Sequence, residues 1–222
     1  MKEYLDIDIW DRKEVFQYFR TLADPTFSVV VDVDVTKAYQ LVGKTRSSFF
    51  VKYLYACMKA INSVENLKYR IEGNKIAIYD VINASATIAR ADTTYGFSFI
   101  NFSENFTVFN ENFKKEKKRI QNSTNLFPQI KSLDCIYCSV LPWISFTSHK
   151  EPNSGNKDDS LPRLAFGGVK EKPVEAKQAD TSPEAEEFSS VTVNASVEEV
   201  RQGLKTKQQD IDTGEIFSKI SR

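Results

Sequence analysis

One segment is more informative about this chain than any other, and it reads Leu141-Pro142-Trp143-Ile144-Ser145-Phe146-Thr147-Ser148-His149. It ends in His149, the single histidine of the 222-residue sequence. The apolar run 133–140 before the segment and residues 143–147 within it are typical of β-strands. After His149 the sequence changes to a polar stretch at 150–160, which predicts a loop.

His149 is a candidate general base, because imidazole takes up and releases protons near neutral pH. Ser148 and Lys150 flank it. The alternative is a polar, exposed side chain at the end of a strand. This second interpretation is favoured, since neighbouring side chains of a strand point to opposite faces of the sheet. A catalytic pair of Ser148 and His149 would have to violate that alternation.

The composition indicates a soluble protein with one hydrophobic core. Hydrophobic residues make up 41% of the chain and aromatic residues 12%, which is enough for one domain-sized core. Thirty basic residues balance thirty acidic ones, so no net charge favours nucleic acid or an anionic membrane as a partner. The sequence opens without an apolar signal segment and contains no apolar run of bilayer length. We therefore expect a cytoplasmic protein.

The cysteines Cys57, Cys135 and Cys138 are too few for a disulfide framework. Cys135-x-x-Cys138 has a spacing found in redox and zinc sites. However, the pair lies in an apolar run and has neither a second pair nor a histidine beside it. Buried structural thiols are therefore expected, and no metal is predicted. The sequence also lacks glycine-rich nucleotide loops and the zinc-protease motif.

Hydrophobic periodicity predicts a mixture of helices and strands. Helices are expected at residues 10–20, 47–63 and 106–120, with a further charged helix at 197–211. Strands are expected at residues 27–35, 69–71, 76–81, 84–91, 95–102, 133–140, 143–147, 164–166 and 190–194. Because strands and helices do not alternate strictly, the fold class is α+β, a mixed α/β sandwich in which helices pack on a mixed β-sheet.

Several segments resemble, in the same order, those of the chloramphenicol acetyltransferases. Residues 141–149 are similar to the active-site region of that family, and the opening Trp10-Asp11-Arg12-Lys13-Glu14-Val15-Phe16 resembles its Trp-x-Arg-Lys-Glu-x-Phe pattern. Further similar segments are Pro25-Thr26-Phe27, 49–62, Tyr69-Arg70-Ile71, Tyr79-Asp80, Phe97-Ser98, Phe109 with Phe113, and Leu126-Phe127-Pro128. Residues 1–168 are thus expected to form a chloramphenicol acetyltransferase-like domain. A charged linker or surface excursion at 169–188 and a divergent strand–helix tail at 189–222 would follow.

The resemblance implies a homotrimer whose active sites lie between subunits. There, the co-substrate acetyl-CoA would transfer its acetyl group to a hydroxyl of chloramphenicol or of a similar small molecule. This activity would confer antibiotic resistance. Ser148 maps onto the serine that donates a hydrogen bond to the tetrahedral oxyanion. Arg12 maps onto the arginine that braces the base histidine through an aspartate. The acceptor pocket would be lined by Phe27, Phe97 and Phe127.

The base histidine of that family belongs to a His-His-x-x-x-Asp-Gly motif, which this sequence lacks. Ser190-Val191-Thr192-Val193-Asn194 resembles the lead-in to the motif, and Ala195 then stands at the expected base position. Loss of such a base costs roughly 10²- to 10⁴-fold in rate. Three hypotheses stay open. The chain is an impaired acetyltransferase, a catalytically silent protein of this fold that binds or assembles, or a recombined product with a foreign final segment.

Overall fold

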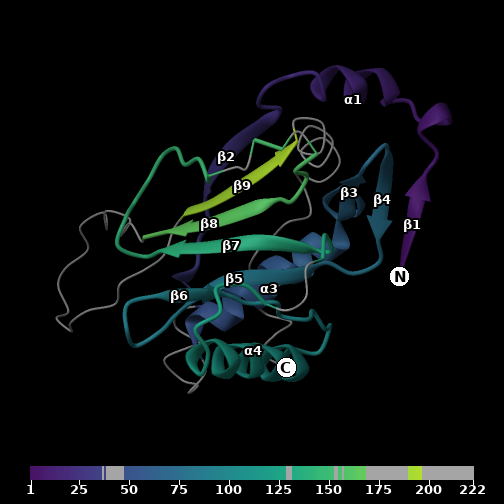
Figure 1. Ribbon diagram of the computed structural model, residues 1–222. Coiled ribbons are helices and arrows are strands. Elements are labelled where there is room, and N and C mark those ends of the chain that lie inside the picture. Colours follow the sequence, from purple (N-terminus) through teal and green to yellow (C-terminus); the bar gives the residue numbers. More distant parts are fainter. Residues whose placement is uncertain are drawn as a thin grey trace.

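The structure is a computed structural model that describes residues 1–36, 38, 48–128, 132–152, 155, 156, 158–168 and the backbone of 190–196. Among these residues the strands form two sheets (Figure 1). The small sheet has the order β1-β4-β3, and the large sheet has the order β2-β9-β8-β7-β5-β6. Helices accompany these mixed sheets, so the predicted α+β class is confirmed. No helix in the described part of the chain is both long and apolar enough to span a bilayer.

The large sheet combines parallel and antiparallel pairs. β5 pairs parallel with β7 and β7 with β8, whereas the other neighbours run antiparallel. Its strands are β2 (Thr26–Asp32), β5 (Asn83–Ala89), β6 (Tyr95–Phe97), β7 (Cys135–Leu141), β8 (Arg163–Gly167) and β9 (Ser190–Ser196). The strand predicted at 190–194 is confirmed, and it lies inside the sheet, between β2 and β8. The predicted linker at 169–188 and the predicted helix at 197–211 fall outside the described residues.

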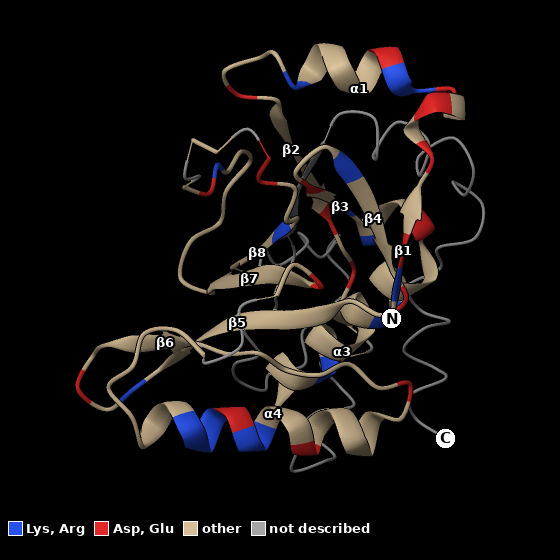
Figure 2. Cartoon of the chain, turned by 45° about the vertical axis from the view of Figure 1, so that its right-hand side comes forward, with Lys and Arg blue, Asp and Glu red and all other residues tan. Residues whose placement is uncertain are grey.

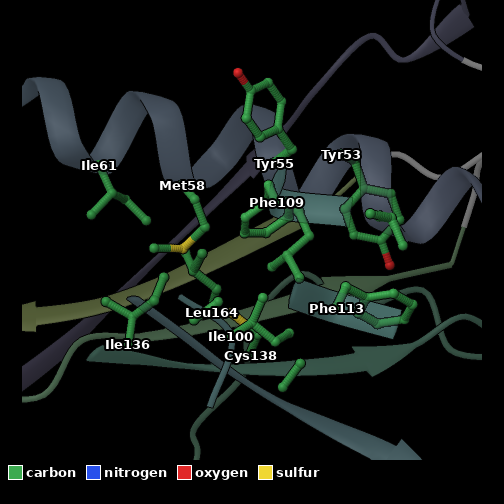
Figure 3. Packing of buried hydrophobic residues seen from close by; sticks show 14 of the residues in the cluster. Tyr53, Tyr55, Met58, Ile61, Ile100, Phe109, Phe113, Ile136, Cys138 and Leu164 are labelled. Atoms are coloured by element: carbon green, nitrogen blue, oxygen red, sulfur yellow. The ribbon is translucent and has the colours of Figure 1, made fainter. Parts of the chain in front are cut away.

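Helix α3 (Phe49–Ser63) forms the core with one face of the large sheet. Figure 3 shows Met58 and Ile61 of this helix directed toward Ile136, Cys138 and Leu164 of the sheet. Each of these five side chains is at most 8% exposed. Complete burial of one such side chain contributes about 1.5–3 kcal/mol. The helical spacing in the sequence therefore identified the face that stabilises the fold.

Helix α4 (Phe106–Gln121) adds its apolar stripe to the same core, with Phe109, Phe113 and Ile120 buried. It begins at Asn105, whose side-chain oxygen accepts hydrogen bonds from the amides of the first turn. Figure 2 shows basic and acidic residues interspersed along the helix. Its exposed side is thus a solvated surface of mixed charge.

The small sheet is a hairpin with one added strand. It consists of β1 (Lys2–Leu5), β3 (Tyr69–Glu72) and β4 (Lys75–Tyr79), and the predicted hairpin is confirmed. Gly73 occupies its turn at a φ of +62°, where other residues are strained. Short 3₁₀ helices η1 (Ile7–Ile9) and η2 (Glu65–Lys68) and helix α1 (Lys13–Phe19), within the predicted 10–20, complete the described elements around it.

The strand predicted at 143–147 is wrong. The chain turns after β7, where the Ile144 amide donates to the Leu141 carbonyl at 3.1 Å. Pro142 has no amide hydrogen to offer a neighbouring strand, which explains why pairing stops there. Trp143 in this loop is 74% exposed, so it does not belong to the core. The segment 142–152 is a loop, and this changes what its side chains can do.

Candidate functional site

Side chains of the large sheet alternate between two faces, and one of them carries a pocket. Ala84 of β5 and Ile136 of β7 point into the core with α3. Ser85 and Tyr137, next to them in sequence, point to the opposite face and line a pocket of about 330 Å³. Pockets of about 300–1,000 Å³ hold small organic ligands. Its volume therefore suits a small molecule.

The pocket is predominantly aromatic and apolar. Its lining residues are Ser85, Phe97, Phe99, Phe127, Pro128, Ser132, Leu133, Cys135, Tyr137 and Leu161. The rings of Phe97 and Phe127 stack, with centroids 5.2 Å apart and planes inclined by 10°. Phe127 is 57% exposed, so part of this wall faces outward. The arrangement offers flat apolar surfaces to an aromatic ligand.

Helix α4 fixes the backbone of this aromatic wall. Arg119 donates from Nη2 to the Phe97 carbonyl at 2.9 Å, and Glu116 accepts from the Phe99 amide at 2.7 Å. Arg119 and Glu116 are also an ion pair at 2.9 Å. The Phe97 amide donates to the carbonyl of Leu126 at 2.8 Å, which attaches the loop bearing Phe127. The stack is thus positioned by hydrogen bonds on both sides.

The polar groups of the pocket are neutral. Burial raises the pKa of the Tyr137 phenol, and the negative charge of Asp159 raises it further. The positive charge of Arg163, which lies 5.9 Å from the ring, lowers this pKa in part. Burial also raises the pKa of the Cys135 thiol to about 11. A thiolate nucleophile is therefore not available at neutral pH. Cys135 and Cys138 are both buried and free, which confirms the structural interpretation of these thiols.

The loop that contains Ser148 is fastened to the start of β2. Lys150 and Asp24 form an ion pair at 2.5 Å. Hydrogen bonds from Lys150 and from Thr26 lower the pKa of Asp24 to about 2. Within the loop, Nε2 of His149 lies 2.9 Å from Oε1 of Glu151. Ser148 itself is exposed, so its hydroxyl is accessible to a ligand.

The family model of chloramphenicol acetyltransferase matches residues 2–169, about three quarters of the chain. The chain belongs to the chloramphenicol acetyltransferase family. The enzyme of that name from Bacillus pumilus is 26% identical over 161 residues, which are 72% of this chain and 73% of that protein. One from Staphylococcus aureus is 26% identical over 170 residues, which cover 73% and 77% of the two chains.

Solved structures agree with this assignment at the level of the fold. A chloramphenicol acetyltransferase matches with a TM-score of 0.73 and 20% identity, over 92% of this chain and 97% of that chain. A probable dihydrolipoamide acetyltransferase from Listeria monocytogenes matches with a TM-score of 0.56 and 15% identity, over 90% and 91% of the chains. The chloramphenicol acetyltransferase-like fold thus rests on both sequence and structure, whereas the chloramphenicol acetyltransferase-like function rests on the sequence comparisons.

The residues that the family resemblance singles out fall into two groups. Phe97 and Phe127 lie together in the pocket beside β6. Phe27 lies in β2, where its Cα pairs with that of Ala195 in β9. The loop of Ser148 reaches the same edge through the ion pair of Lys150 with Asp24. Because five strand spacings separate β2 from β6, the two groups are about 24 Å apart within one chain.

Arg12 stands apart from both groups. It precedes α1. Burial raises the pKa of the Tyr69 phenol in the small sheet to about 12, and the charge of Arg12 opposes this rise. The motif aspartate that would link Arg12 to the base is absent from the sequence, and Glu198 and Glu199, which stand near its expected position, lie outside the described residues. In the part of the chain that the structure describes, no cluster of histidine, cysteine or carboxylate side chains could hold a metal ion.

Ser85, Phe99, Tyr137 and Leu161 were not foreseen as pocket residues. The strand predicted at 133–140 already implies that Tyr137 points away from Ile136 and Cys138. The alternation does not indicate which face of the sheet remains open, because this depends on α3, which covers the other face.

Proposed function

We propose that this protein transfers the acetyl group of acetyl-CoA to a hydroxyl of chloramphenicol or of a similar small apolar alcohol. The observation that carries the proposal is the pocket with the stacked Phe97 and Phe127, in a chain of this family. A nitrophenyl or comparable aromatic group fits against this flat apolar wall better than a charged substrate would. The chain is proposed to act in the cytoplasm, as a determinant of antibiotic resistance.

The chemistry requires an oxygen nucleophile and a stabilised oxyanion. The acceptor hydroxyl attacks the thioester carbonyl, and the exposed Ser148 hydroxyl donates a hydrogen bond to the resulting oxyanion. Removal of one oxyanion donor costs roughly 10²- to 10³-fold in kcat. The phenol of Tyr137 stays protonated in the pocket, where it offers a neutral hydrogen-bond donor to the acceptor.

A homotrimer would bring the two groups of site residues together. Within one chain Phe97 and Phe127 are too far from Ser148 and Phe27 to touch one small acceptor. In a closed assembly the pocket of one subunit can face the β2 edge of the next. The exposure of Phe127 and Trp143, 57% and 74%, supports this, because large apolar side chains at a surface indicate an interface.

The proposed activity lacks the base of the family motif. By resemblance, Ala195 takes the position of the family's imidazole, and His149 is the single histidine of the sequence. Unless another residue of the chain acts as the general base, the hydroxyl attacks poorly, at a cost of roughly 10²- to 10⁴-fold. The same observation favours a second candidate, a catalytically silent protein that binds acetyl-CoA or the acceptor.

Release of the CoA thiol by purified protein with acetyl-CoA and chloramphenicol distinguishes the two candidates. We expect saturable turnover that falls at least about 100-fold in Ser148→Ala. Ser139→Ala is the matched control, since Ser139 lies in β7 and does not line the pocket. Saturable binding by calorimetry without any thiol release would establish the silent binding protein instead.

A further inference from the structure

The loop after β7 contains a histidine–carboxylate pair to which the family resemblance gives no role. Nε2 of His149 lies 2.9 Å from Oε1 of Glu151, and the two side chains are only 20% and 16% exposed. The ring of Phe146 lies 5.0 Å from the imidazole and covers part of it. Ion pairs on a solvated surface are mobile and contribute little, whereas this pair is largely shielded from water. Its geometry is therefore well defined.

Glu151 determines which nitrogen of the imidazole carries the proton. A carboxylate only accepts hydrogen bonds, so Nε2 must be the donor in the neutral ring. Nδ1 then carries the free lone pair and can accept a proton from a ligand. A histidine held by a carboxylate on one nitrogen and free to react on the other is the arrangement of a general base with its orienting acid.

The loop conformation removes the objection to joint action of Ser148 and His149. Opposite orientation of neighbouring side chains is a property of strands, and residues 142–152 do not form one. The loop is also anchored. Its ion pair from Lys150 to Asp24 holds it just before β2, the strand that pairs with Ala195. The imidazole is thus tied to the start of β2, the edge strand that pairs with β9 at Ala195.

We propose that His149 is the general base of acetyl transfer in this protein, and that Glu151 is its positioning residue. This inference rests on the function proposed above. Nδ1 takes the proton of the acceptor hydroxyl while the oxygen bonds to the thioester carbonyl carbon. The tetrahedral oxyanion accepts a hydrogen bond from Ser148. The carbon–sulfur bond then breaks, and the departing CoA sulfur takes the proton from Nδ1, which leaves the acetyl ester and free CoA thiol.

Kinetics of three glutamine variants test the assignment. His149→Gln is expected to lower kcat by roughly 10²- to 10⁴-fold with an unchanged KM for acetyl-CoA. Glu151→Gln is expected to lower kcat by about tenfold, because an amide still accepts from Nε2 but no longer carries a charge opposite the imidazolium. Glu111→Gln is the matched control, since Glu111 pairs with Lys114 on the exposed side of α4. Its kcat should equal that of the wild type.

The outcomes separate this inference from the function on which it rests. Wild-type protein without any turnover overturns the proposed function, and the role of His149 with it. Turnover that is retained in full by His149→Gln overturns the inference alone. Nitrogen-15 NMR gives a second readout that needs no activity, because the chain has one imidazole. We expect the Nε2–H tautomer in the wild type, and a predominant Nδ1–H tautomer would overturn the assignment of the base.

Discussion

Asp24 and Lys150 show how one contact between charged side chains positions the loop of Ser148. Hydrogen bonds from Lys150 and Thr26 lower the pKa of Asp24 from 3.8 to about 2. A carboxyl whose pKa is lower in the folded state stabilises the fold at pH values above its unfolded pKa. This stabilisation is therefore present above about pH 4 and is lost as the pH falls toward 2.

We predict that Asp24→Asn has a smaller loss of stability in acid than the wild type. The variant lacks the titrating group, so its midpoint of thermal unfolding should fall less between pH 5 and pH 2.5. Lys150→Met, which removes the partner, should behave in the same way. Identical pH profiles of wild type and both variants would show that the ion pair does not form in solution.

Phe127 is predicted to contribute to acceptor binding and little to folding. Its ring is 57% exposed and stacks on Phe97. Loss of an aromatic contact costs about 0.5–1.5 kcal/mol, so Phe127→Ala should raise the KM for chloramphenicol by roughly 2- to 12-fold. The KM for acetyl-CoA should not change. Leu126→Ala is the control, since Leu126 is similarly exposed but does not line the pocket; equal effects of both changes would argue against the pocket.

At the scale of elements, Arg70 joins the small sheet to the large one. It is fully buried in β3, and its guanidinium donates to the carbonyls of Leu133 and Cys135 at 2.7 and 2.9 Å. It also donates to Leu67 and to its neighbour Tyr69. Leu133 and Cys135 line the pocket. The hairpin is therefore part of the support for the site, although none of its own residues lines it.

We predict that Arg70→Met destabilises the protein by about 3 kcal/mol or more, because several buried carbonyls lose their donors at 1–3 kcal/mol each. Urea unfolding followed by fluorescence measures the change. Lys117→Met, at an exposed position of α4, should stay within about 0.5 kcal/mol of the wild type. A loss of less than 1 kcal/mol in Arg70→Met would mean that water replaces these hydrogen bonds.

The elements that the sequence predicts well are those whose core face repeats regularly. Helices α3 and α4 and the hairpin follow from the spacing of their apolar residues and from Gly73. The segment 143–147 has the same apolar character, but Pro142 and the turn at Leu141 prevent it from pairing. The pocket depends on contacts between distant segments, such as Phe97 with Phe127 and Tyr137. Local patterns contain the residue types of such a site but not their proximity.

At the scale of the whole molecule, the proposed site draws on two separated groups of residues, so we predict that activity requires assembly. The proposed homotrimer of the 25.3-kDa chain should migrate as a particle of about three times that mass. Turnover per chain should decrease on dilution in step with dissociation. Activity that is independent of concentration in a proven monomer would require that one chain alone holds a complete site.

Trp143→Glu is predicted to dissociate the assembly without unfolding the chain. Trp143 is 74% exposed and its neighbour Ile144 is 45% exposed, so a charge at position 143 is not buried in the core of the chain. It should instead disrupt the proposed apolar contact between subunits. Light scattering should report monomers, thiol release should disappear, and circular dichroism should stay unchanged. Val108→Glu, at a 48% exposed apolar position of α4, is the matched control and should stay assembled and active. A trimeric, active Trp143→Glu would place the subunit interface on another surface.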